Sequence, residues 1–110
     1  MARFVKGDVV VVPFPFSDLT ATKRRPALVL AGLEGDDVVL CQITTQTSAD
    51  SYSIPIGSAD FIDGGLKHPS NVRPSRLITI DSNIVLYRAG QLSAERVNEV
   101  VAKAVEILSR

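Results

Sequence analysis

Short runs of valine, isoleucine and leucine recur along the chain, separated by polar, glycine-containing or proline-containing segments. Runs of this length rich in β-branched residues favour β-strands over helices. The pattern predicts strands over residues 9–12, 27–31, 38–44, 52–56 and 72–80. A turn at Gly35-Asp36 joins the second run to the third, so these two are expected to form an antiparallel hairpin.

Prolines indicate where the sheet has edges. Pro13 and Pro15 follow the first run at alternate positions, so both missing N–H groups lie on one side of the chain. This is tolerated only at a strand end or an edge. Pro55 likewise predicts an edge position for the fourth strand. The segment between the fourth and fifth strands is expected to be irregular, with Gly64-Gly65 as its hinge.

The end of the chain has the spacing of an amphipathic helix. Its apolar stripe consists of Val97, Val100, Val101, Ala104, Val105 and Leu108. Ser93 is expected to be the N-cap, and Leu92 and Val97 to form a hydrophobic staple around it. Before the helix, Asp81 is expected to cap a short turn. Five strands followed by one helix predict a mainly β (α+β) fold in a single domain over residues 1–110, a small twisted antiparallel β-barrel with the helix against it.

Composition places the chain among ordinary globular domains, with 110 residues, 45% hydrophobic and 22% charged. The single Cys41 excludes an internal disulfide and suits a reducing cytoplasm. We recognise no signal peptide, and no apolar run approaches the roughly 20 residues of a membrane span. A cytoplasmic protein without membrane contact is therefore expected.

Charges are sorted along the chain although they sum to zero. Residues 1–26 carry five cations and two anions, residues 27–66 six anions and no cation, and residues 67–96 five cations and two anions. If the fold brings the first and third segments together, one face becomes basic. Such a face is typical of proteins that bind nucleic acid.

Several kinds of chemistry are excluded by the residues present. His68 is the single histidine and Cys41 the single thiol, so a zinc site with several such ligands is absent. The chain has no glycine-rich phosphate loop and no nucleophile-elbow motif. We therefore expect no metal and no cofactor, and any catalysis would depend on arginine, lysine, hydroxyl groups and one carboxylate.

A cluster of cations, Lys23-Arg24-Arg25, ends a polar loop over residues 17–25 and precedes Pro26. Proline fixes its own φ and biases the preceding residue towards extended geometry, so the Arg25 guanidinium is expected at a strand entrance. In isolation such a cluster is more often a solvated turn. Its context in the chain favours function.

Five segments together resemble one known family. They are Gly7-Asp8-Val9-Val10, residues 12–19 (VPFPFSDL), residues 23–30 (KRRPALVL), Gln42-Ile43-Thr44 and residues 75–92. The family that they resemble is PemK/MazF, and the resemblance covers essentially the whole chain. It implies an SH3-like antiparallel β-barrel with a C-terminal helix, acting as a homodimer.

The resemblance also implies a function. PemK/MazF proteins are toxins of bacterial toxin–antitoxin pairs, and they are metal-independent endoribonucleases. They cut single-stranded RNA, mRNA included, at short sequences and leave a 2′,3′-cyclic phosphate and a 5′-hydroxyl. The implied partners are the RNA substrate, a cognate antitoxin that neutralises the toxin, and operator DNA bound only by the toxin–antitoxin complex.

By resemblance to the family, Arg25 and Thr44 are the catalytic residues. Their chemistry fits this role: attack of a ribose 2′-hydroxyl on phosphorus builds negative charge on the phosphoryl oxygens. A guanidinium can bind two of these oxygens, and a threonine hydroxyl can donate a further hydrogen bond. A guanidinium is a poor general base, so the base remains unassigned.

Strand geometry separates Thr44 from its neighbour Thr45. Successive residues of a strand point to opposite faces, so at most one of the two hydroxyls can face the phosphate beside Arg25. The Ile-Thr pattern of the family selects Thr44.

Further residues are candidates for RNA binding: Lys23, Arg24, Lys67, Ser70, Arg73, Ser75 and Arg76. One departure concerns an aspartate that some family members carry after a Val-Arg motif and that has been proposed to take part in proton transfer. Aligning Val72-Arg73 places Ser75 there. Either this protein does not need that acid, or Asp81 or Asp18 replaces it, or catalysis is weak.

Two other functions fit the same fold class. One is a toxin that poisons DNA gyrase without cleaving RNA. In that family a tryptophan-containing C-terminus carries the activity, and this chain has no Trp. The other is a non-catalytic barrel that binds nucleic acid, since a fold does not dictate a function.

Overall fold

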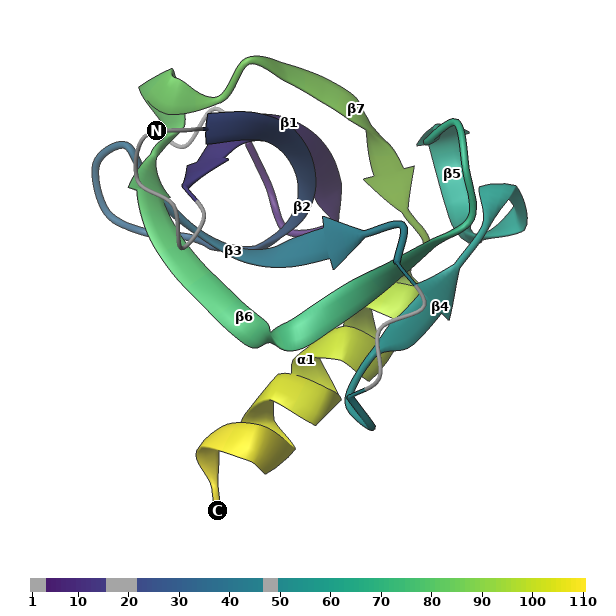
Figure 1. The fold of residues 1–110 in the computed structure, drawn as a ribbon. Coiled ribbons are helices and arrows are strands. Elements are labelled where there is room, and N and C mark those ends of the chain that lie inside the picture. Colours follow the sequence, from purple (N-terminus) through teal and green to yellow (C-terminus); the bar gives the residue numbers. More distant parts are fainter. Residues whose placement is uncertain (1–3, 16–21, 47–49) are drawn as a thin grey trace.

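The computed structural model describes residues 4–15, 22–46 and 50–110, which form a curled antiparallel sheet with a helix packed against it (Figure 1). The elements are β1 (Asp8–Pro15), β2 (Thr22–Gly32), β3 (Asp37–Thr44), β4 (Ile54–Ile56), η1 (Ser58–Asp60), β5 (Phe61–Gly64), β6 (Ser70–Asp81), η2 (Ser82–Ile84), β7 (Tyr87–Leu92) and α1 (Ala94–Leu108). Within the described residues the strand order is β4-β6-β3-β2-β1-β7-β5. The sheet curls into a half-barrel, which confirms the predicted mainly β barrel with a C-terminal helix.

Alternation along the central strands divides the core into two clusters. On β3, Cys41 and Ile43 pack in the cluster that includes Val97 and Val100 of α1. Leu40, one residue away, packs in a second cluster with buried valines of β1 and β2. Because the side-chain period of a strand is two residues, one strand supplies both clusters.

Two strands were not predicted, namely β5 and β7. β5 has mainly exposed side chains, β7 buries only Gly90 and Leu92, and neither has alternating apolar residues, so the hydrophobic pattern did not reveal them. Gly64, interpreted as a hinge, is instead paired with Gly90 across the two strands. A Cβ on Gly64 would lie 2.2 Å from the carbonyl oxygen of Ala89, so the backbones approach at a distance that only glycine allows.

The proline-containing ends of the strands are longer than predicted. β2 begins at Thr22, so the cation cluster lies inside a strand and not at the end of a loop. Its pairing with β3 begins at Ala27, one residue after Pro26. β1 extends to Pro15, but its pairing with β7 stops at Val11, so the proline-bearing half has one neighbouring strand. The edge position of β4 is confirmed.

The helix begins as predicted, with the Ser93 hydroxyl accepting a hydrogen bond from the Arg96 amide at 3.3 Å. Its buried stripe is narrower than predicted. Val97, Val100 and Ala104 are buried, whereas Val105 and Leu108 are 57% and 72% exposed. The reason is visible in Figure 1, where the last turns of α1 extend past the sheet.

Asp8, the first residue of β1, links three segments: the residues before β1, β1 itself and β7. Its carboxylate accepts hydrogen bonds from Arg88 Nε at 3.0 Å and from the Val5 amide at 3.0 Å, and the residue is 4% exposed. The Asp8→Ala variant should therefore lose about 1–3 kcal/mol of unfolding free energy, because several hydrogen bonds to one buried, charged acceptor are lost. Urea unfolding measures this loss. Asp63→Ala is the control, since Asp63 contacts the same arginine from a side chain that is 55% exposed, and it should change stability by less than about 0.5 kcal/mol.

Candidate active site

Arg25 and Thr44 lie towards the same end of two neighbouring strands, β2 and β3. The register of β2 and β3 pairs Ala27 with Gln42, and continued by two residues along both strands it places Arg25 opposite Thr44. Residues directly opposite in an antiparallel pair share one face of the sheet. Thr44 is paired in turn with Asn71 of β6. A single row across β2, β3 and β6 therefore carries a guanidinium, a hydroxyl and an amide.

A second row runs parallel to the first, two residues away on each strand. Here Gln42 of β3 is paired with Ala27 on one side and with Arg73 on the other. A spacing of two residues along a strand keeps side chains on the same face. Arg73 therefore shares a face with Arg25 and Thr44, where the second hydrophobic cluster gives way to polar side chains.

Thr44 is oriented by the turn that follows β3. Thr44 is 7% exposed, and its Oγ1 accepts a hydrogen bond from the Gln46 amide at 3.2 Å. Asn71 Nδ2 donates to the Gln46 carbonyl at 3.0 Å and holds the same turn. Since a hydroxyl is both donor and acceptor, Thr44 retains a hydrogen to donate. Thr45 lies beyond the end of β3 and is exposed.

A carboxylate not considered in the sequence analysis belongs to this group. Asp50 Oδ2 lies 3.0 Å from Arg73 Nη2 and 3.4 Å from Ser75 Oγ. Hydrogen bonding from Arg73, followed by smaller contributions from Ser53 and the Tyr52 amide, lowers the pKa of Asp50 to about 2. Ser75 reaches it from a bulge in β6, where residues 74–76 have no partner on β3.

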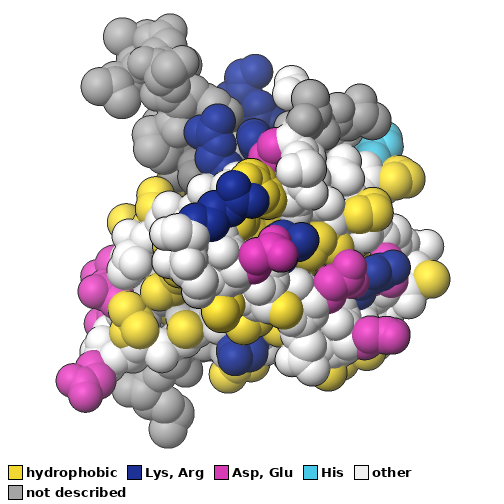
Figure 2. Space-filling view, turned by 90° about the horizontal axis from the view of Figure 1, so that it is seen from below, with side chains coloured by type: hydrophobic (Ala, Val, Ile, Leu, Met, Phe, Trp, Pro, Cys, Tyr) yellow, Lys and Arg dark blue, Asp and Glu magenta, His cyan; other side chains and the backbone are white. Residues whose placement is uncertain are grey.

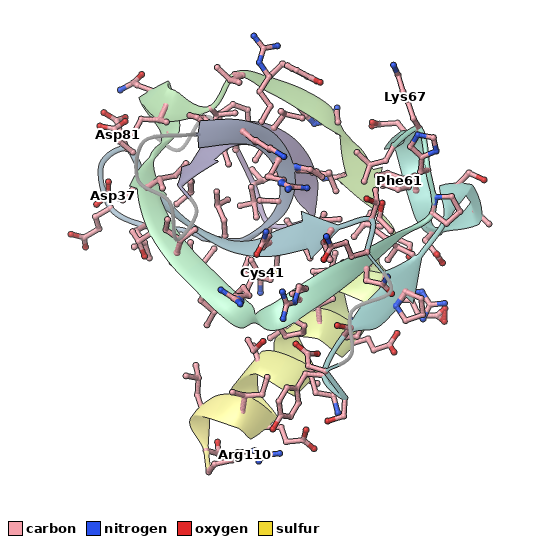
Figure 3. All side chains as sticks on the ribbon, in the orientation of Figure 1. Asp37, Cys41, Phe61, Lys67, Asp81 and Arg110 are labelled. Atoms are coloured by element: carbon pink, nitrogen blue, oxygen red, sulfur yellow. The ribbon has the colours of Figure 1, made fainter. Side chains whose placement is uncertain are left out.

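The other residues predicted to bind RNA are distributed around this group. Lys23 and Arg24 are exposed on β2 beside Arg25, and Arg76 is exposed in the β6 bulge. Lys67 is exposed in the segment before β6 (Figure 3), whereas Ser70 is buried and donates its hydroxyl hydrogen to the His68 carbonyl at 2.9 Å.

Of the two expected replacements for the missing aspartate, Asp81 lies away from Arg25. Asp81 is paired with Asp37, at the opposite end of β3 from Thr44, as Figure 3 shows. There Asp81 Oδ1 accepts a hydrogen bond from the Asn83 amide and caps η2, the capping role predicted for it. Asp18 lies outside the described residues.

Comparison with known proteins identifies the family. The family model for PemK-like, MazF-like toxins of type II toxin–antitoxin systems matches residues 5–108. The chain belongs to this family.

Solved structures of similar proteins share the fold of this family member. One is MazF from Deinococcus radiodurans, with 18% identity, a TM-score of 0.77 and 97% of each chain covered. Another is an endoribonuclease in complex with its cognate antitoxin from a mycobacterial species, with 14% identity, a TM-score of 0.76 and coverage of 96% of this chain and 95% of that one. A third is the Mycobacterium tuberculosis toxin MazF-mt6, with 20% identity, a TM-score of 0.68 and coverage of 91% and 96%. A search of curated protein sequences returned no significant match.

The basic surface of this toxin-family chain is smaller than the sorted charges suggested. Lys23–Arg25 on β2 and residues 73–76 on β6 flank the end of β3. Arg88 is paired with Asp8 and Asp63, and Arg96 with Asp60 and Glu99, so these two add little to a basic face. Figure 2 shows one group of blue side chains near the top and others lying beside magenta ones.

Two further searches of the described residues gave no candidates. No group of three or more His, Cys, Asp or Glu residues that could hold a metal ion occurs among them. None of their helices is long and apolar enough to span a membrane.

Proposed function

We propose that this chain is an endoribonuclease toxin that cleaves single-stranded RNA at the face formed by Arg25, Thr44 and Arg73. The observation that carries the proposal is the register of β2, β3 and β6, in which Gln42 is paired with Ala27 and Arg73; continued two residues past Ala27–Gln42, it brings Arg25 opposite Thr44 on the face of Arg73. The endoribonucleases among the structural neighbours support it through a shared fold.

In the proposed reaction, a ribose 2′-oxygen forms a bond to the adjacent phosphorus while the bond from phosphorus to the 5′-oxygen breaks. The 2′-hydroxyl proton leaves to a base that we do not assign, and the leaving 5′-oxygen gains a proton. The products are a 2′,3′-cyclic phosphate and a 5′-hydroxyl. Arg25 binds two phosphoryl oxygens as their charge grows, and Thr44 donates a hydrogen bond to the same group.

The exposed cations around this face are proposed to bind the flanking phosphates. Lys23 extends from β2 on the face of Arg25, Arg24 extends from the opposite face of the same strand, and Arg76 lies on β6 on the other side of Thr44. Such contacts contribute affinity and position the strand without reading its sequence. Lys67, Ser70 and Ser75 complete the proposed RNA-binding set.

The proposed assembly is a cytoplasmic homodimer neutralised by a cognate antitoxin. MazF of Deinococcus radiodurans was solved in complex with MazE, and a mycobacterial relative with its own antitoxin. An acidic, partly disordered antitoxin segment that folds over the basic residues of β2 and β6 would fit their charge. Operator DNA would be bound by the toxin–antitoxin complex only.

Cleavage should persist without a divalent metal, because the guanidinium and hydroxyl supply the charge stabilisation. Purified protein incubated with mixed-sequence RNA in excess EDTA should yield fragments whose ends map as 2′,3′-cyclic phosphate and 5′-hydroxyl. Activity lost in EDTA and restored by Mg²⁺ would contradict metal independence. RNA bound but left intact would indicate a non-catalytic binding protein, and inhibition of gyrase without cleavage a gyrase poison.

A further inference from the structure

Asp50 is held at both carboxylate oxygens by residues of this chain. Oδ1 accepts hydrogen bonds from the Tyr52 amide at 3.0 Å and from Ser53 Oγ at 2.9 Å. Oδ2 accepts from Arg73 Nη2 at 3.0 Å and from Ser75 Oγ at 3.4 Å. One oxygen thus fixes Asp50 in its own turn, and the other is directed at the β6 bulge beside Arg73.

Arg73 is the better-enclosed partner of this pair. Its side chain is 18% exposed and that of Asp50 is 24% exposed. The enclosed Arg73 side chain has few rotamers available, and its guanidinium is bound by Asp50 through one nitrogen. Asp50 therefore sets the orientation of this guanidinium on the face shared with Arg25 and Thr44.

Proton transfer is a poor assignment for this carboxylate. With a pKa of about 2, Asp50 is ionised throughout the neutral range and is a weak base in the free protein. Because the pKa is lowered, the ion pair stabilises the fold above the ordinary pKa of an aspartate, and this stabilisation is lost as the pH falls towards about 2.

We infer that Asp50 is a positioning residue, which orients Arg73 towards the scissile phosphate and supplies, from the turn before β4, a carboxylate next to the position of Ser75. This inference rests on the proposed endoribonuclease function.

The test is the Asp50→Asn variant, which separates the contacts of Oδ1 within the turn from the contact of Oδ2 with Arg73. Asparagine also favours Asx turns, so its Oδ1 can still accept from Tyr52 and Ser53, but its amide presents donors to Arg73, itself a donor. Single-turnover cleavage of a labelled RNA should slow about tenfold, because the guanidinium loses its orientation. The Kd for the same RNA, measured by fluorescence anisotropy, should stay within about twofold, since the protein loses a negative charge and no cation.

Two further variants locate the effect. Asp81→Asn makes the same chemical change in a capping turn at the far end of β6, and its cleavage rate should equal that of the wild type. In an Arg73→Ala background, Asp50→Asn should slow cleavage by less than about twofold further, because Asp50 acts through Arg73.

The outcomes are distinguishable. A wild-type protein that cleaves no RNA refutes the proposed function itself. If the wild type cleaves and Asp50→Asn cleaves equally fast or faster, the positioning role is wrong. The positioning role is also wrong if the slowing persists in full in the Arg73→Ala background. A weaker RNA affinity together with a lower melting temperature would indicate a structural role for Asp50. Loss of an acidic limb from the pH–rate profile would indicate a proton-transfer role.

Discussion

The Arg25→Ala variant should show no detectable RNA cleavage while its melting temperature stays within a few degrees of the wild type. Its guanidinium is the cation opposite Thr44, and removing it leaves the developing phosphoryl charge without a bidentate partner. Arg25 is half-buried at the start of β2, outside both hydrophobic clusters, so its truncation removes little apolar packing. Single-turnover cleavage and thermal unfolding measure the two effects.

Arg25→Lys and Arg24→Ala give this prediction its controls. Lysine retains the charge but not the planar fork, so Arg25→Lys should also be poorly active. Arg24 is exposed and is the next residue of the same strand, so its side chain points to the other face. Arg24→Ala should slow cleavage several-fold at most. If Arg25→Lys cleaved RNA at the wild-type rate, Arg25 would act through its positive charge alone and not through bidentate binding.

The sequence predicted the fold where burial imposes a pattern. The central strands and α1 carry apolar residues at the periods of their elements, and both were located to within a few residues, apart from the longer proline-bearing ends. β5 and β7 are held by backbone pairing and by the close approach of Gly64 and Gly90. Neither strand has an alternating apolar pattern, and a glycine in a close pair is indistinguishable in sequence from one in a hinge.

The candidate site could be predicted from the sequence only where its residues belong to local motifs. Arg25 and Thr44 belong to local motifs, so a resemblance could select them, and their opposition follows from the register of one hairpin. Asp50 has no such signal. Its position beside Arg73 depends on the pairing of β6 with β3 and β4 and on a bulge of residues 74–76, which are long-range features of the sheet. Its sequence context, a short polar loop, is typical of solvated turns.

Thr44→Ala should slow single-turnover cleavage by about 10²-fold, the scale of losing one hydrogen bond to a transition state. Thr44 is the last residue of β3, on the face shared with Gln42 and opposite Arg25. Thr44→Ser keeps the hydroxyl, including its acceptor role towards the Gln46 amide, and should retain most of the activity. This variant distinguishes loss of a donor from a change in the turn.

Thr45→Ala is the sharpest comparison, because it deletes the same groups from the adjacent residue. Thr45 is exposed and follows the end of β3, so strand pairing does not direct its hydroxyl towards Arg25. Its truncation should change the rate several-fold at most, through the turn that Gln46 and Asn71 hold. If Thr45→Ala were the damaging variant and Thr44→Ala nearly silent, the hydroxyl that serves the phosphate would lie on the loop after β3, and the row of Arg25, Thr44 and Asn71 would be a structural feature of the sheet.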